Sequence, residues 1–330
     1  MNKLGFITSS GLGDILFDLT GFVTFCKLTK KQPVCQWCVE SDNDIYPWGI
    51  GLFDKTLFNF PAYIEFVDEL PADMDRIYSD NTSISTCMVK IHKYIKTIPL
   101  EEVITSYYST LMEIIKPSNI IRYPANIEKA IGIHLRRSDK IKEMNEEIDL
   151  RHETLITEYD SILSELCICI ENIAKISIDS VMYFYICSED KEYVVAFKKQ
   201  IFAICQKNNK IARFCEPIYD KKYKGVEAVT DMFYLSKCSC ILQGTKYSTF
   251  SIIAAIIGKK PLYNFGHHSD KSLMHIWKPY LTLVNNGILL DHILNGASLI
   301  NVSDGFSDMV IASKKTNLSM NDMIKKYIRR

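Results

Sequence analysis

The chain has 330 residues, a length that allows one large domain but favours two. Its 47% hydrophobic and 24% charged residues are typical of a globular protein, and no apolar run is long enough to predict a membrane span. The 39 basic and 39 acidic residues cancel, so no bulk positive field would attract nucleic acid. We therefore expect neither nucleic-acid binding nor a membrane span.

The first half of the chain opens with a strand, a glycine turn and a helix. Residues 3–8 have the composition of a strand, Gly11 and Gly13 lie in the turn, and residues 15–25 have helical apolar spacing. Such a turn can face a phosphate or a sugar, although a Gly-x-Gly sequence more often serves only as a turn. Residues 42–80 are rich in aromatic and turn residues, which predicts irregular structure with short strands.

The rest of the chain alternates helices and strands. Helices are expected over 98–115, 155–176, 191–208, 225–236, 250–257 and 320–330, and strands over 131–134, 181–187, 211–214, 240–243 and 260–264. This alternation predicts a doubly wound α/β domain over about residues 125–290. Because 117–129 resembles a linker, we predict an N-terminal domain over 1–124 and a C-terminal domain over 125–330.

The eleven cysteines do not predict disulfides or a metal site. Residues 1–8 lack the long apolar core of a secretory signal, so we expect a cytoplasmic protein with reduced cysteines. Cys35 and Cys38 have redox or zinc spacing, but no second pair follows at the spacing that a four-ligand zinc site requires. We therefore predict no metal.

A cationic cluster follows the first strand of the second half. Residues 131–140 read Ile-Gly-Ile-His-Leu-Arg-Arg-Ser-Asp-Lys, so an apolar run opens into Arg136 and Arg137. Most arginine pairs are solvated or neutralised by acids. Here, however, the pair follows a buried strand, and ligands of parallel α/β sheets bind just outside the carboxyl ends of the strands. Since guanidinium groups bind phosphate in a bidentate manner, the cluster predicts a phosphorylated or diphosphate ligand.

This segment resembles the His-x-Arg-Arg-x-Asp motif of the α1,2-, α1,6- and protein-O-fucosyltransferase superfamily, with the closest likeness to the α1,6-fucosyltransferases. The resemblance implies that the matching arginine of the pair binds the diphosphate of GDP-fucose, and Arg136 and Arg137 are suited to stabilise the negative charge of the departing diphosphate. It places His134, Asp139 and Lys140 in the same site, although His134 could also be structural and pack beneath the arginines.

Three further segments extend the resemblance over residues 125–265. Asp190 matches the second acid of a pair that contributes to nucleotide recognition, and Glu189 replaces the first with a longer side chain; alternatively, both belong to a helix N-cap cluster in which Ser188 is the cap. Asp231 matches an aspartate that is linked to the donor site. A polar loop before the helix at 250–257 matches a phosphate-binding loop, although its hydroxyls could also serve only as caps. The loop residues concerned are Thr245, Ser248 and Thr249.

The first half matches the superfamily only at the turn of Gly11 and Gly13, where Asp14 replaces the common asparagine. The resemblance implies an α/β fold of the GT-B type, with two facing Rossmann-like domains. It further implies inverting transfer of L-fucose from GDP-fucose onto a hydroxyl of an oligosaccharide or glycoprotein glycan. We expect no cofactor and no metal, because no clear Asp-x-Asp motif follows an apolar strand.

The identity of the residue that acts as general base stays open. The glutamate proposed for the family falls at Met144 in this chain, so the adjacent Glu143 is our candidate, and Glu146, Glu147 and Asp149 are alternatives. Two other functions fit the same residues. One is a xylosyl- or rhamnosyltransferase that uses another nucleotide sugar, and the other is a non-catalytic nucleotide- or sugar-binding module.

Overall fold

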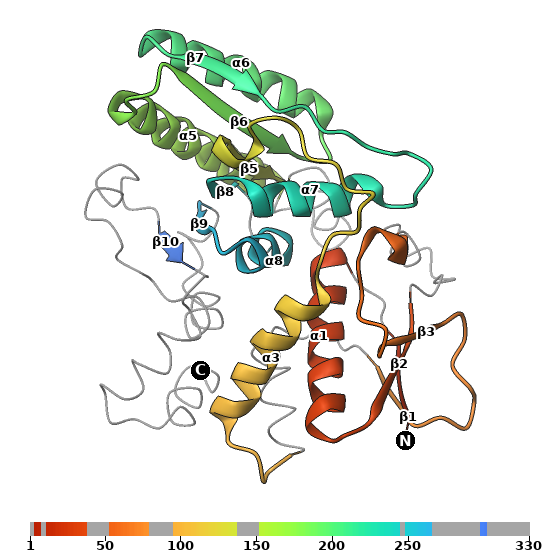
Figure 1. Cartoon of the computed structure of the whole chain (residues 1–330). Helices are drawn as coiled ribbons and strands as arrows, with labels where there is room; N and C mark the ends of the chain where they lie inside the picture. Colours follow the sequence, from red (N-terminus) through yellow and green to blue (C-terminus); the bar gives the residue numbers. More distant parts are fainter. Residues whose placement is uncertain are drawn as a thin grey trace, which may run out of the picture.

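The computed structural model describes residues 3–7, 11–37, 53–78, 95–136, 152–244, 248–265 and 298–301. These residues form two separate sheets with helices packed on them, as Figure 1 shows. All the strand pairs in the sheets are parallel except one at an outer edge. The predicted fold class, an α/β chain with two Rossmann-like sheets, is confirmed.

The N-terminal sheet has the strand order β3-β2-β1-β4. Its strands are β1 (Lys3–Ile7), β2 (Gln32–Gln36), β3 (Glu65–Val67) and β4 (Arg76–Tyr78), and its helices are α1 (Leu12–Leu28), the short η1 (Lys55–Leu57) and α3 (Leu100–Ile114). The short strands β3 and β4 agree with the expectation for 42–80. The sequence did not predict β2, which contains Pro33. The ladder to β3 begins only at Val34, so the missing N–H of Pro33 is not needed on that side.

The C-terminal sheet has the order β10-β9-β8-β5-β6-β7. Its strands are β5 (Ile131–Leu135), β6 (Val181–Cys187), β7 (Ile211–Phe214), β8 (Cys240–Gly244), β9 (Pro261–Asn264) and β10 (Ser298–Asn301), and its helices are η2 (Ile127–Lys129), α5 (His152–Ile176), α6 (Lys191–Lys207), α7 (Val226–Lys237) and α8 (Thr249–Gly258). The predicted elements between 131 and 264 are confirmed within a few residues at each end. β10, which is antiparallel to β9, was not predicted, and the expected helix at 320–330 lies outside the described residues.

The strand order predicts where a ligand crevice would lie in the C-terminal sheet. From β5 the chain moves outward to β6 and β7, then crosses back to β8 on the other side of β5. Such a reversal leaves a crevice outside the carboxyl ends of the two strands at the switch point, and doubly wound sheets bind ligands there. His134 is in register with Gln243 and Leu135 with Gly244, so β5 and β8 end side by side. Arg136 follows directly.

One hydrophobic core joins the two halves. Figure 1 shows α7 and α8 between the C-terminal sheet and the helices α1 and α3 of the N-terminal half. The core includes Leu16 of α1, Tyr107 of α3, Phe233 of α7 and Ile253 of α8, all at most 1% exposed. A second core lies between the C-terminal sheet and the helices α5 and α6. The predicted boundary at 124/125 lies between the two sheets and stays a prediction, because the shared core continues across it.

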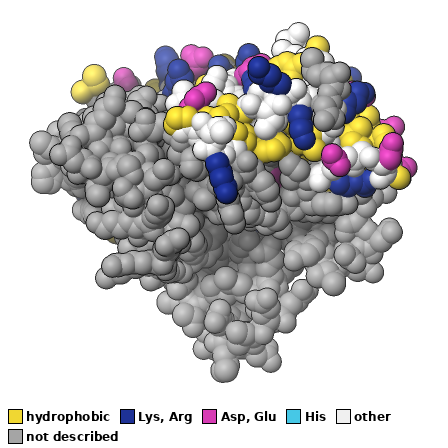
Figure 2. Space-filling model, turned by 90° about the horizontal axis from the view of Figure 1, so that it is seen from below, with side chains coloured by type: hydrophobic (Ala, Val, Ile, Leu, Met, Phe, Trp, Pro, Cys, Tyr) yellow, Lys and Arg dark blue, Asp and Glu magenta, His cyan; other side chains and the backbone are white. Residues whose placement is uncertain are grey.

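The described surface agrees with the zero net charge. On the face in Figure 2, basic, acidic and apolar side chains of the described residues are intermingled. Within the described ranges, no helix has the length and apolar character needed to cross a membrane.

Candidate functional site

His134 connects the end of β5 to the first turn of α8. Its side chain is 6% exposed, and its Nδ1 atom lies 2.5 Å from Oγ of Ser251. Its ring also packs on that of Phe250, with 5.0 Å between the centroids. Burial, together with the nearby charge of Arg136, lowers the pKa of His134 to about 3, so the imidazole is neutral. These contacts favour the interpretation of His134 as a structural residue that fixes α8 against β5.

Ser248 is the N-cap residue of α8 and has a buried hydroxyl without a partner. The residue is 2% exposed, and its side chain makes no capping hydrogen bond. Among the described residues, its Oγ atom has no hydrogen-bond partner at all. An unsatisfied buried polar group costs about 1–3 kcal/mol. Because the first N–H groups of a helix also lack intrahelical partners and carry partial positive charge, the start of α8 is suited to an anion.

The glycine turn of the N-terminal half lies against this same helix start. A Cβ atom added at Gly13 would clash with Oγ1 of Thr249 and would lie only 2.9 Å from the backbone nitrogen of Phe250. Only a residue without a side chain allows the first turn of α1 to approach α8 so closely. Two helix amino ends therefore meet near Arg136, and the three groups concentrate positive potential at the predicted crevice.

Asp231 of α7 forms a cluster with two tyrosines. The hydroxyl of Tyr185 in β6 donates to its Oδ1 atom at 2.5 Å, and the hydroxyl of Tyr219 donates to the same oxygen at 2.6 Å. Burial raises the pKa of Asp231 to about 7, the two hydrogen bonds oppose this rise, and the charge of Glu227 adds to it. The carboxyl group can therefore change its charge near neutral pH.

The two acidic residues at the end of β6 differ in what the structure shows of them. Asp190 is the N-cap of α6, because its side chain accepts a hydrogen bond from the backbone N–H of Tyr193 at 3.0 Å. The capping alternative is therefore correct for Asp190, whereas Ser188 was the wrong choice of cap. Oγ of Ser188 instead accepts from the N–H of Asp190 at 3.2 Å. Glu189 is exposed at the same strand end, and its contact with a nucleotide stays a prediction.

Several predicted site residues lie outside the described ranges, namely Arg137, Asp139, Lys140, Glu143 and Thr245. Within the described part, no group of three or more His, Cys, Asp or Glu side chains could hold a metal ion.

Sequence reasoning missed Ser251, Tyr185 and Tyr219, whose partners are 117, 46 and 12 residues away along the chain. The only signal was a tyrosine in a buried strand, since a buried tyrosine hydroxyl usually has a partner.

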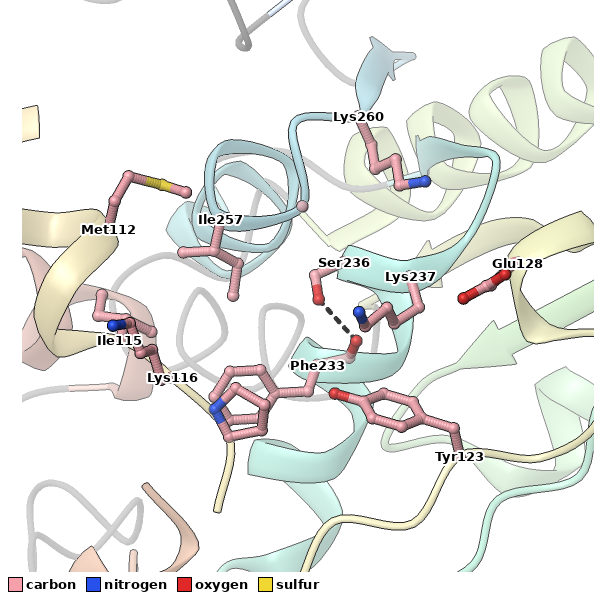
Figure 3. A pocket seen from close by; sticks show the side chains of 12 residues that line it. Met112, Ile115, Lys116, Tyr123, Glu128, Phe233, Ser236, Lys237, Ile257 and Lys260 are labelled. Atoms are coloured by element: carbon pink, nitrogen blue, oxygen red, sulfur yellow. Dashed lines mark hydrogen bonds between the residues drawn. The ribbon is translucent and has the colours of Figure 1, made fainter. Parts of the chain in front are cut away.

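A cavity of about 550 Å³ lies at the opposite edge of the C-terminal sheet (Figure 3). It is bounded by the carboxyl ends of α3, α7 and α8. Its lining residues Glu128, Lys237 and Lys260 precede β5, β8 and β9, so the cavity adjoins the amino ends of these strands. A five-residue strand spans roughly 16 Å. The cavity is therefore separate from the crevice at Arg136.

Comparison of the sequence with family models and with curated proteins finds no match. Among solved structures, the chain is similar to the fucosyltransferase NodZ from Bradyrhizobium, with 12% identity and a TM-score of 0.46 over 81% of this chain and 97% of that one. NodZ α1,6-fucosyltransferase soaked with GDP-fucose gives 13% identity and a TM-score of 0.43, over 80% of this chain and 95% of that one. A mutant of Arabidopsis thaliana FUT1 in complex with GDP gives 10% identity and a TM-score of 0.43, over 80% and 70%. Identities and TM-scores this low assign neither a function nor a residue.

Proposed function

We propose that this chain is a glycosyltransferase that binds a nucleoside diphosphate sugar at the carboxyl ends of β5 and β8. The observation that carries the proposal is the buried hydroxyl of Ser248 at the start of α8, which has no hydrogen-bond partner among the described residues, in the segment that follows β8, the neighbour of the β5 strand that Arg136 follows. A diphosphate would provide oxygen acceptors for this hydroxyl and for the free N–H groups of the helix. The Arg136 guanidinium would supply the balancing charge.

The same groups would promote transfer. Glycosyl transfer passes through an oxocarbenium-like transition state while negative charge develops on the departing diphosphate. Arg136, the predicted partner Arg137 and the amino end of α8 would stabilise that charge. In the inverting reaction, an acceptor hydroxyl bonds to the anomeric carbon as the bond to the diphosphate breaks. The hydroxyl proton would pass to a base, for which Glu143 is our candidate.

The proposed donor is GDP-fucose and the proposed acceptor is a glycan hydroxyl. The donor rests on the resemblance of residues 131–140 to the superfamily motif, and Asp231 and Glu189 offer carboxylate acceptors for the donor side. The N-terminal half, which reaches the crevice at Gly13, would hold the acceptor. Met144, at the position of the family's proposed base, favours a second candidate, a binding module without transfer.

The experiment that tests this function measures the release of GDP from GDP-fucose in the presence of oligosaccharide acceptors. We expect release and a fucosylated product with the wild-type protein, and neither with Arg136→Ala. Arg213→Ala, which removes an exposed arginine on β7, is the matched control and should retain activity. Binding of GDP-fucose without release of GDP would favour the non-catalytic module. Turnover of a UDP- or dTDP-sugar would show that the donor is that nucleotide sugar and not GDP-fucose. Full activity in Arg136→Ala would refute the assigned site.

A further inference from the structure

The two hydrogen bonds to Asp231 come from separate parts of the fold. Tyr185 lies on β6, and Tyr219 lies in the segment that leads from β7 into α7. Both hydroxyls donate to Oδ1, at 2.5 and 2.6 Å. Among the described residues, the other oxygen, Oδ2, accepts no hydrogen bond, and Asp231 keeps part of its surface exposed. The contacts therefore fix one carboxylate oxygen and leave the other available.

The surroundings of this carboxylate exclude a simple ion-pair role. Its neighbours within the described residues are Tyr185 and Cys187 of β6, Tyr219, and Glu227 and Tyr234 of α7. Burial raises the pKa values of both tyrosines that bond to Asp231, so their hydroxyls stay protonated and act as donors. The carboxylate is therefore held by neutral donors and an adjacent acid. Such a group would repel phosphate and would attract the N–H or O–H groups of a neutral ligand portion.

We propose that Tyr185 and Tyr219 are positioning residues that orient Asp231, so that its second oxygen accepts a hydrogen bond from the nucleoside part of the donor. This inference rests on the proposed function, because it assumes that a nucleotide sugar occupies the crevice. Arg136 and the start of α8 would then hold the diphosphate, and the Asp231–Tyr185–Tyr219 cluster would read the uncharged part of the same ligand.

The proposal predicts a pH dependence of donor affinity that shifts when either tyrosine loses its hydroxyl group. Asp231 accepts hydrogen bonds through both oxygens only when it is ionised, so affinity should fall as the pH falls through about 7. Each tyrosine hydrogen bond lowers the pKa of the carboxyl group. Removing one donor should therefore raise this pKa further and move the binding midpoint to higher pH.

The test is calorimetric titration with GDP on both sides of neutral pH, for the wild-type protein, Tyr219→Phe and Tyr185→Phe. Tyr183→Phe is the matched control, because Tyr183 lies on the same face of β6 two residues earlier. We expect Tyr219→Phe and Tyr185→Phe to lose roughly fivefold in affinity at pH 7 for a pKa rise of about one unit, and to recover most of it at alkaline pH. Equal weakening at every pH, or no weakening, would overturn the proposal, as would a shifted midpoint in Tyr183→Phe.

A second measurement separates this inference from the proposed function. The pKa of Asp231 is raised in the folded protein, so its stabilising protonation is complete at low pH and is lost as the pH rises through about 7. In the ligand-free Tyr219→Phe protein, where the folded-state pKa would be higher still, this loss of thermal stability should continue to higher pH than in the wild-type protein. If the wild-type protein binds no GDP at any pH, the proposed GDP-sugar donor fails. The dependence of thermal stability on pH in the ligand-free protein then still tests the tyrosines. If Tyr219→Phe left it unchanged, the hydrogen bond from Tyr219 would not affect the pKa of Asp231.

Discussion

Ser248 provides the most direct residue-scale test of the proposed phosphate contact. Its hydroxyl has no hydrogen-bond partner among the described residues, so Ser248→Ala should leave thermal stability unchanged or slightly higher. Loss of one hydrogen bond to a charged ligand should weaken GDP binding by about 1.5–3 kcal/mol, roughly tenfold or more. Calorimetry and thermal melting would measure the two effects.

Ser236→Ala is the control for this substitution. Ser236 is also buried, but its hydroxyl donates to the carbonyl oxygen of Phe233 at 2.7 Å, as drawn in Figure 3. Its removal should lower stability and leave GDP affinity unchanged. The reverse pattern, a destabilised Ser248→Ala protein with normal affinity, would show that the Ser248 hydroxyl is structural.

Asp231 leads to a residue-scale prediction about pH. Because burial raises its pKa to about 7, keeping it ionised costs folding free energy above that pH. Asp231→Asn removes this cost, so the variant should gain melting temperature relative to the wild-type protein at alkaline pH. The gain should shrink towards pH 5, where the wild-type carboxyl group is protonated. Melting curves across this range would check the trend, and a gain that grows at acidic pH would contradict it.

At the scale of elements, the contact between α1 and α8 depends on Gly13. A methyl group at this position would meet backbone atoms of the first turn of α8, so Gly13→Ala must push the two helices apart. We expect a loss of about 1–3 kcal/mol of stability and weaker GDP binding, because the shift disturbs the helix end that would hold the phosphate. Gly11→Ala is the steric control, since no atom of the described residues lies within 4 Å of its added Cβ atom.

Chemical denaturation of both glycine variants would measure this effect. A Gly13→Ala protein that is as stable as Gly11→Ala, with unchanged affinity, would contradict the close packing of α1 on α8.

The elements of the C-terminal half were predictable from sequence, whereas the contacts between them were not. Apolar runs such as 181–187 and the strand-helix alternation define buried parallel strands by local pattern alone. β2 was missed because Pro33 disfavours a strand, and only the short ladder to β3 makes it acceptable. Ser188 was predicted as the N-cap of α6, but the N-cap is Asp190, two residues later along the chain. Both residue types can cap a helix, so the sequence alone did not decide between them. The tyrosine bonds to Asp231 depend on topology, which brings distant residues together.

For the candidate site, sequence located the groups that follow strand ends. Arg136 comes directly after β5, and Ser248 comes just before α8. The strands that they adjoin, β5 and β8, end side by side because they pair, and local periodicity cannot specify this pairing. Local periodicity also cannot predict the close approach of Gly13 to Thr249, because these residues belong to different halves of the chain.

At the scale of the whole molecule, we predict transfer without a metal. The diphosphate charge would be balanced by arginine and by helix ends, so a chelator should leave the rate of GDP release unchanged. Assays with EDTA, and with manganese added back, would check this. Complete loss with EDTA that manganese restores would show that a metal carries the charge instead.

The central claim is that GDP binds at the crevice formed by β5, α8 and the amino end of α1. Thermal melting with GDP, UDP, dTDP and CMP tests it most directly. A ligand at about a hundred times its dissociation constant adds roughly 2.7 kcal/mol, enough to raise the melting temperature by several degrees. We predict that GDP produces this shift in the wild-type protein and in Arg213→Ala, but not in Arg136→Ala. An equal shift in Arg136→Ala, or no shift with any of the four nucleotides, would contradict the account.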